Sequence, residues 1–275
     1  MIIDGKKVSD EIKNSIALEV SKLDIKPCLV VIQIGDDEAS NVYVKAKEKA
    51  CNLVGMNFKH IKFDNETLES DIINKIKELN SDELVNGIIV QLPIDKKYNV
   101  EKILNTIDKN KDVDGLTDIN CGLLFKEKDG LTPCTPLGII KLLEYYNIDL
   151  ESKNVVVVGK SNLVGKPLSM LLLKKGATVT ICHSKTNDLS THTKNADILI
   201  VAVGKKHLIT EDMVKENSVI IDVGINRIDG KLYGDVDFDN IKNKVSYITP
   251  VPGGVGPMTV AMLLNNVLIN YKKMY

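Results

Sequence analysis

The sequence lacks an excess of charge of either sign, long apolar runs and internal repeats. Its 275 residues include 36 Lys and Arg against 37 Asp and Glu, for a formal net charge of -1. So weak a charge does not hold a phosphate backbone or an anionic membrane surface. No apolar run approaches the roughly 20 residues that a membrane-spanning helix needs. We therefore expect a globular protein with no nucleic-acid or membrane partner.

Disulfide and metal-binding patterns are also missing. The five cysteines and four histidines are scattered, without C-x-x-C, without H-E-x-x-H and without a histidine pair at helical spacing. This argues against disulfides, structural zinc and any metal held by the protein. The chain opens MIIDGKKVSD, which has neither an apolar nor an Arg-rich leader pattern. We therefore expect a cytoplasmic protein.

What is present is a regular alternation of helical and strand patterns. In the first part the periodicity predicts helices near 8–22, 39–54 and 67–79 and strands at 28–34, 57–63 and 87–92. Both periodicities lapse in the turn-rich stretch 112–130. The alternation then resumes with a helix at about 136–147, strands at 154–159, 177–182, 197–203, 218–223 and 246–249, and a last helix at about 257–273.

These patterns predict an α/β protein of two domains. Continuous apolar strands in the second part are typical of a mainly parallel sheet that helices cover on both faces. We predict an N-terminal α/β domain over 1–118 and a C-terminal domain with a mainly parallel sheet over 119–256. The pattern alone leaves open which of the two domains the last helix, 257–275, joins.

A nucleotide-binding signal begins at the end of the strand 154–159. The segment Gly159-Lys-Ser-Asn-Leu-Val-Gly165 opens a helix, so backbone N–H groups converge where a pyrophosphate can sit. It reads G-x-S-x-x-x-G instead of G-x-G-x-x-G, and an ordinary strand-to-helix turn is the alternative interpretation.

The next strand carries information about the cofactor. It ends Cys182-His-Ser-Lys-Thr186, without the acidic residue that holds a ribose 2′-hydroxyl in NAD-selective folds. Ser184, Lys185 and Lys160 suit a 2′-phosphate instead, which favours NADP. The alternative is that both lysines are only solvated surface charges.

One lysine of the first domain has an unusual position on its helix. The segment 37–54 reads as a helix capped by Ser40 or Asn41. At 100° per residue Lys47 falls within the apolar stripe, whereas Lys45 points to solvent; the stripe contains Tyr43, Ala46, Ala50, Leu53 and Val54. A lysine that faces inward is desolvated, which lowers its pKa and lets it exchange protons near neutrality. Lys47 is therefore a candidate acid/base, unless it only covers core surface with its stem while its head reaches water.

Three further features could contribute to the same site. Gln91 ends a buried strand, where ligands bind in open α/β sheets, although it equally fits a loop cap. Asp114 precedes a glycine turn, a place where most aspartates make Asx-turns. The segment 249–259 holds three glycines and three prolines in eleven residues. Such a composition predicts a rigid backbone pressed against a flat ligand.

Together these segments resemble the bifunctional methylenetetrahydrofolate dehydrogenase/methenyltetrahydrofolate cyclohydrolase family over nearly the whole chain. The motifs that carry the resemblance are Ile3-Asp-Gly-Lys6, Ala39-Ser-x-x-Tyr-Val-x-x-Lys47, Gln91-Leu-Pro93, Lys111-Asp-Val-Asp-Gly115, Pro133-Cys-Thr-Pro136 and Pro252-Gly-Gly-Val-Gly-Pro-Met-Thr259. The resemblance implies that the first domain, 1–118, is an N-terminal α/β catalytic domain and that the second, 119–256, is a C-terminal Rossmann-type NADP domain. It implies a homodimer in which tetrahydrofolate derivatives bind between these two domains. It also implies that the last helix packs on the first domain.

The resemblance implies both an activity and the residues that carry it. The activity is oxidation of 5,10-methylenetetrahydrofolate by NADP, followed by hydrolysis of the methenyl product to 10-formyltetrahydrofolate. Lys47 resembles the catalytic lysine, Tyr43 the ring that stacks on folate, Gln91 the partner of the lysine and Asp114 the acid that grips the pterin. The implied folate-binding residues are Tyr43, Lys47, Gln91, Leu92, Asp114, Pro252, Gly253 and Gly256.

The cofactor side of the resemblance is carried by a second set of residues. These are Thr135, Gly159, Lys160, Ser161, Val164, Ser184, Ile225 and Thr259. The family usually has arginine where this chain has Lys160, and lysine lacks the bidentate grip of arginine on a phosphate, so NAD is kept as an alternative cofactor. A dehydrogenase without the hydrolase step and a non-catalytic dinucleotide-binding regulator are the alternative functions. The intact set of Tyr43, Lys47, Gln91 and Asp114 speaks against both.

Overall fold

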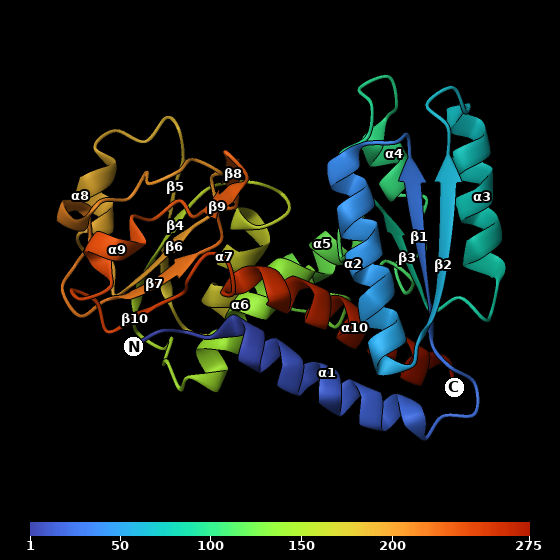
Figure 1. Ribbon diagram of the computed structural model, residues 1–275, viewed down its shortest axis with the longest axis horizontal. Coiled ribbons are helices and arrows are strands. Elements are labelled where there is room, and N and C mark those ends of the chain that lie inside the picture. Colours follow the sequence, from blue (N-terminus) through green and yellow to red (C-terminus); the bar gives the residue numbers. More distant parts are fainter. The chain divides into compact units, whose positions relative to one another are not determined.

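A computed structural model describes residues 1–275, and its backbone divides into two compact units. Unit 1 comprises Met1–Ser9 and Thr135–Thr259, and unit 2 comprises Asp10–Cys134 and Val260–Tyr275. Each unit contains a parallel sheet with helices, which confirms the predicted α/β class (Figure 1). The helices α1 (Gly5–Ser21) and α10 (Val255–Met274) each have residues in both units. The functional domain boundary at residue 118 stays a prediction.

Unit 2 is built on a sheet of three parallel strands. Their order is β2-β1-β3, with β1 at Cys28–Ile34, β2 at Asn57–Phe63 and β3 at Gly87–Val90. The central strand β1 is buried throughout, whereas side chains of the edge strand β2 are largely exposed. One side of the sheet packs on α3 (Glu69–Ser81) and α4 (Val100–Leu104), where Val30 and Ile32 meet Ile72 and Ile76. The strands predicted at 28–34 and 57–63 are confirmed.

The helix α2 (Glu38–Val54) differs from its prediction at its start and in its buried face. Asp37 is the N-cap, since its Oδ2 accepts a hydrogen bond from the Ser40 N–H at 2.8 Å, so the predicted caps Ser40 and Asn41 are wrong. Leu53 is 67% exposed. The buried face is rotated by roughly 60° from the predicted stripe, because small residues also face inward; it contains Ser40, Val44, Ala50, Cys51 and Val54.

Unit 1 has a five-stranded parallel sheet with the order β10-β7-β6-β4-β5. Its strands are β4 (Asn154–Val158), β5 (Thr178–Cys182), β6 (Ile198–Val201), β7 (Val219–Asp222) and β10 (Tyr247–Ile248). From β4 the chain goes to β5 on one side and then to β6 on the other. The strand order therefore reverses at β4, and dinucleotides bind at the carboxyl ends of strands beside such a reversal.

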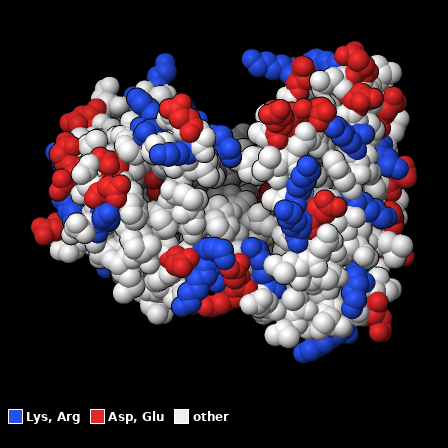
Figure 2. Space-filling model, in the orientation of Figure 1, with Lys and Arg blue, Asp and Glu red and all other residues white.

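The helices of unit 1 and the remaining short elements connect these strands. They are α6 (Cys134–Tyr145), α7 (Gly165–Lys174), α8 (Leu189–Thr193), the 3-10 turn Glu211–Met213 and α9 (Phe238–Ile241). Positive and negative side chains are interspersed over the face that Figure 2 shows. None of the helices combines the length and the apolarity that crossing a lipid bilayer requires.

Several short elements were not predicted from the sequence, α4, α8, the 3-10 turn and α9 among them. A hairpin joins β8 (Asn226–Ile228) to β9 (Lys231–Tyr233) through Asp229 and Gly230, both with positive φ (49° and 74°). Asp-Gly with positive φ at both positions is the preferred two-residue hairpin turn, so the signal was present in the sequence. The helix α5 (Asp118–Phe125) lies in the turn-rich stretch, where Thr117 caps it by accepting from the Asn120 N–H.

Candidate active site

Lys47 and Gln91 meet in unit 2, as the sequence suggested. Lys47 lies on the buried side of α2, half-buried itself, and its Nζ donates a hydrogen bond to Gln91 Oε1 at 2.7 Å. Gln91 follows β3 and is only 8% exposed. Its own Nε2 donates to the Leu92 carbonyl at 2.6 Å. Because the amide nitrogen is used in this way, the amide oxygen faces the lysine.

Burial lowers the pKa of Lys47 below its ordinary value. The negative charge of Asp114 acts in the opposite direction and so does Cys134, but burial is the larger effect. An amine with a lowered pKa is neutral in a larger fraction of molecules near neutrality, so it can accept a proton there. Lys45, two residues earlier on the same helix, is exposed, as predicted.

The two aspartates of the Asp-Val-Asp-Gly motif have different surroundings. Asp112 is 2% exposed and accepts hydrogen bonds from the Leu116 N–H (3.1 Å), the Thr117 N–H (2.8 Å), Thr117 Oγ1 (2.8 Å) and Asn120 Nδ2 (2.8 Å). The bonds from the Leu116 and Thr117 N–H groups hold the backbone that follows the Gly115 turn close to Asp112. Asp112 is therefore the turn-forming aspartate, and the carboxylate of Asp114 is left for another role.

Asp114 lies opposite Lys47 in a buried environment. Burial raises the pKa of this carboxyl, the positive charge of Lys47 lowers it, and nearby Asp112 raises it further. The thiol of Cys134 is hydrogen-bonded to Asp114. Burial and the neighbouring carboxylates raise the pKa of Cys134 well above its ordinary value, so this thiol remains protonated and is no nucleophile.

Cys134 is a site residue to which no role was assigned from the sequence. It is 2% exposed, and its Sγ also lies 3.3 Å from the Val113 carbonyl oxygen. Its only signal in the sequence is its place between two prolines in the motif 133–136. A lone cysteine among prolines carries no chemical prediction by itself, because the contact with Asp114 arises only in the folded chain.

Tyr43 and Leu92 complete the predicted residues of unit 2. Tyr43 precedes Lys47 by one turn of α2, and its ring is 51% exposed. A half-exposed ring beside the lysine is available to stack on a flat ligand. Leu92 is half-buried and supplies the carbonyl that fixes Gln91. The structure thus brings Lys47, Gln91 and Asp114 together. Tyr43 lies one turn before Lys47 on α2, and Leu92 directly follows Gln91.

In unit 1 the loop after β4 leaves no room for side chains at two glycines. Gly159 has φ 129°, and a Cβ there would lie 2.4 Å from the Ala202 carbonyl oxygen. A Cβ at Gly165 would lie 2.0 Å from the Gly159 oxygen. Such glycines allow the tight turn and the close approach of helix to strand that a bound pyrophosphate needs. The predicted strand–turn–helix context is confirmed.

Ser161 organises the same loop and leaves Lys160 free to face a ligand. Its Oγ accepts hydrogen bonds from the Val164 N–H at 3.1 Å and the Gly165 N–H at 3.5 Å. Lys160 is exposed at the end of β4, and Ser184 is exposed just after the neighbouring β5. The pairing Val158↔Cys182 places these two strand ends side by side. No acidic residue follows β5 before Thr186, so this corner suits a 2′-phosphate.

The remaining predicted residues of unit 1 lie around the Pro/Gly-rich loop. Thr135 and Thr259 join their hydroxyls in a 2.9 Å hydrogen bond. Ile225 is 49% exposed, and a Cβ at Gly256 would lie 3.9 Å from its Cδ1. The Gly253 carbonyl accepts from the Lys6 N–H at 2.9 Å, which braces the loop. Pro252 next to it is exposed.

Two buried aspartates that were not predicted fix the loops at the carboxyl edge of this sheet. Asp235 is fully buried and accepts from the backbone N–H groups of Val203 (2.8 Å), Gly204 (3.0 Å) and Lys205 (2.7 Å). Asp222 accepts from those of Gly224 (3.0 Å), Asp235 (3.0 Å) and Val236 (2.9 Å). Burial raises the pKa of Asp222 to about 6. Asp222 ends an apolar strand, which was its signal in the sequence.

Comparison with known proteins covers both units. Residues 3–114 match the catalytic domain of the tetrahydrofolate dehydrogenase/cyclohydrolase family, and residues 133–275 match its NAD(P)-binding domain. The bifunctional protein FolD of Sulfurihydrogenibium sp. is 53% identical over 279 residues, covering 99% of this chain and 98% of the relative.

Solved structures agree with this match. The bifunctional enzyme FolD of Campylobacter jejuni has a TM-score of 0.99 at 46% identity, covering 100% of this chain and 99% of that one. The Trypanosoma brucei methylenetetrahydrofolate dehydrogenase-cyclohydrolase, solved with NADP cofactor and an inhibitor, has a TM-score of 0.95 at 33% identity, covering 99% and 97%. The chain therefore belongs to the tetrahydrofolate dehydrogenase/cyclohydrolase family.

Proposed function

We propose that this chain catalyses both reactions of its family. It oxidises 5,10-methylenetetrahydrofolate to the 5,10-methenyl cation with NADP, and it hydrolyses that cation to 10-formyltetrahydrofolate. The observation that carries the proposal is the Lys47 amine, hydrogen-bonded to Gln91 Oε1 at 2.7 Å and facing the Asp114 carboxyl. Hydrolysis needs a group that transfers protons, such as a desolvated amine beside a neutral amide and an acid. Hydride transfer alone does not need such a group.

For the oxidation, the chain's own residues bind and orient. When bound, NADP accepts a hydride from the methylene carbon. Gly159 and Gly165 leave space for a pyrophosphate at the start of α7, and Ser161 keeps the loop in shape. Lys160 and Ser184 are assigned to the 2′-phosphate, while Thr135, Val164, Ile225 and Thr259 are assigned to the rest of the cofactor. NAD remains the alternative cofactor.

For the hydrolysis, Lys47 moves protons. Water adds to the methenyl carbon, and neutral Lys47 takes the proton that the water loses as the carbon–oxygen bond forms. The bond from this carbon to N5 then breaks, N5 takes a proton from the Lys47 ammonium, and the hydroxyl proton leaves as the formyl C=O forms. The net reaction consumes one water molecule and releases one proton. The lowered pKa of Lys47 makes both of its transfers accessible near neutrality.

The folate ring is assigned to residues around the lysine. Asp114 accepts hydrogen bonds from the pterin amino and ring N–H groups, which would stabilise the ionised form of a carboxyl whose pKa burial raises. The Tyr43 ring stacks on the folate, and Leu92 adjoins it. Pro252, Gly253 and Gly256 are assigned to the folate-lining loop of the family.

The chain is also assigned as a homodimer. In unit 2 the outer edge of β2 is unpaired, and α2 exposes an apolar stripe formed by Val42 (61% exposed), Ala46 and Leu53 (67% exposed). Edge strands and exposed apolar stripes are surfaces that proteins normally cover. Light scattering should give twice the 30.4 kDa chain mass. Leu53→Glu should lower the mass that light scattering gives. Leu18→Glu should leave this mass unchanged, although Leu18 on α1 is as exposed as Leu53.

The cytoplasm is the proposed compartment, and no nucleic-acid partner is assigned. All five cysteines are free thiols, which suits a reducing compartment. The net charge of -1 gives no field for a polyanion.

A direct assay tests the proposed function. Purified protein is mixed with methylenetetrahydrofolate and NADP or NAD, and the reduced cofactor and the methenyl intermediate are followed by absorbance. We expect reduction of NADP followed by decay of the methenyl signal. Reduction without enzymatic decay would indicate a dehydrogenase only, and no turnover with either cofactor would indicate a binding protein.

A further inference from the structure

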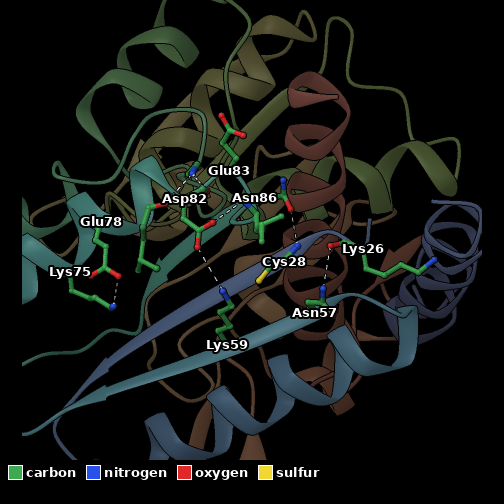
Figure 3. Close-up of polar contacts among 12 residues, drawn as sticks. Lys26, Cys28, Asn57, Lys59, Lys75, Glu78, Asp82, Glu83 and Asn86 are labelled. Atoms are coloured by element: carbon green, nitrogen blue, oxygen red, sulfur yellow. Dashed lines mark hydrogen bonds and ion pairs between the residues drawn. The ribbon is translucent and has the colours of Figure 1, made fainter. Parts of the chain in front are cut away.

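Two buried asparagines lie one turn apart on the unit 2 part of α10. Asn266 is 2% exposed, and its Nδ2 lies 2.9 Å from the Val113 carbonyl oxygen and 2.9 Å from that of Thr132. Asn270 is 1% exposed, and its Nδ2 donates to the Asn86 carbonyl at 2.7 Å. Asn86 Oδ1 in turn accepts from the Cys28 N–H at 2.9 Å (Figure 3). The two residues thus make the same kind of bond to different segments.

The two carbonyls that Asn266 binds belong to the segments whose side chains meet at the site. Val113 immediately precedes Asp114, and Thr132 lies two residues before Cys134, whose thiol is hydrogen-bonded to Asp114. The Asn266 Nδ2 also lies 3.7 Å from Cys134 Sγ. A single amide group therefore holds the backbone on both sides of the Asp114–Cys134 contact.

The two segments are already closely packed beside this amide. Gly115 has φ 70°, and a Cβ there would lie 2.6 Å from the Pro133 nitrogen. Asn120 links the same segments at their other end, accepting from the Leu131 N–H at 3.3 Å and donating to Asp112 at 2.8 Å. Between these contacts, the carbonyl directly before Asp114 has two side-chain neighbours, the Asn266 amide nitrogen at 2.9 Å and Cys134 Sγ at 3.3 Å, and the Asn266 amide also donates to the Thr132 carbonyl. Without Asn266, the Val113 and Thr132 carbonyls each lose a donor, and the Asp114 backbone can shift.

We infer that Asn266 is a positioning residue: it holds the carboxylate of Asp114 in register with Cys134 and Lys47 for binding the pterin. The inference rests on the proposed function, in which Asp114 grips the substrate. Asn266 itself does not reach the substrate. It acts through the backbone of Val113 and Thr132, so its effect should vanish when Asp114 can no longer bind.

A double-mutant cycle tests this inference. Asn266→Ala should raise KM for methylenetetrahydrofolate on the order of tenfold, because a misplaced charged acceptor loses most of its hydrogen-bond energy, and leave the Kd for NADP unchanged. In an Asp114→Ala background the same substitution should change KM less than twofold. Asn266→Ser, which keeps one donor, should have a KM for methylenetetrahydrofolate between those of Asn266→Ala and the parent.

Asn270→Ala is the matched control. It removes an equally buried amide from the same helix and should lower stability, but it should leave KM at the parental value. Parental KM in folded Asn266→Ala, or equal effects in the presence and absence of Asp114, would overturn the positioning role. If Asp114→Ala itself keeps parental KM, the proposed role of Asp114 fails instead.

Discussion

Lys47 and Gln91 are 44 residues apart in the chain and meet in a 2.7 Å hydrogen bond from Nζ to Oε1. The amide orients the amine without adding a negative charge beside it. A carboxylate in this place would raise the pKa of the lysine and keep it protonated. The pairing therefore preserves the lowering of the Lys47 pKa that burial produces.

This relationship predicts the effect of Gln91→Glu on pH dependence. The new carboxylate would raise the Lys47 pKa, so the neutral amine would appear only at higher pH. The rising limb of the rate of methenyl hydrolysis against pH should move upward by about one unit or more. Gln91→Met, which adds no charge, should lower the rate without moving the limb upward. An unchanged limb in Gln91→Glu would exclude Lys47 as the titrating group.

Asp114→Asn should weaken both activities. The amide keeps one acceptor but loses the charge, and a hydrogen bond to a charged group accounts for roughly ten- to hundredfold in kcat/KM. NADP binding should be unaffected, because the cofactor residues lie in unit 1. Asp129→Asn, an exposed aspartate of unit 2, is the control. Parental kcat and KM for both reactions in folded Asp114→Asn would reduce Asp114 to a turn residue.

Lys160→Arg should increase the preference for NADP over NAD. Arginine can contact the 2′-phosphate with two parallel hydrogen bonds, whereas lysine offers a single point charge. The ratio of kcat/KM for the two cofactors measures the change, and Lys174→Arg, exposed at the end of α7, is the control. A better use of NAD than of NADP by the parent chain would contradict the assignment of this corner.

Asp222 should make stability depend on pH. Its pKa rises from 3.8 to about 6 on folding, so between these values the folded chain binds more protons than the unfolded chain. Stability from this group therefore falls as pH rises from 4 to 6, by up to about 3 kcal/mol. Urea unfolding of the parent and of Asp222→Asn at several pH values should show their difference shrinking as pH rises. If the unfolding free energies of the parent and of Asp222→Asn differ by the same amount at every pH, Asp222 does not titrate between pH 4 and 6.

The sequence predicted the sheets well and the contacts between distant segments poorly. The strands β1 and β2 were predictable because their apolar patterns are strong and local. The buried face of α2 was misplaced because Ser40 and Cys51, which face inward, carry little hydrophobic signal. Lys47 was identified nonetheless, since its direction depends on helix geometry alone.

The supporting residues of the site were less predictable. Cys134 and Asn266 act through contacts with Asp114 and with the backbone before it, and no local pattern announces such contacts. Asp235 is similar, since its partners are backbone N–H groups of a loop remote in the sequence. Asp222 was visible as the polar end of an apolar strand, but its contacts with the Asp235 and Val236 N–H groups were not. Residues that bind backbone can be recognised only after the chain has brought the segments together.

The central claim is that Lys47 carries the proton transfers of hydrolysis and not the hydride transfer. Lys47→Met keeps the apolar stem and removes the amine, and Lys45→Met makes the same change on the exposed side of α2. Both variants should melt near the parent. The decisive measurement compares methenyl hydrolysis and NADP reduction in these two proteins. We expect Lys47→Met to lose about 10²–10⁴-fold in hydrolysis and far less in NADP reduction, with Lys45→Met near the parent in both. Parental hydrolysis in folded Lys47→Met would contradict the account.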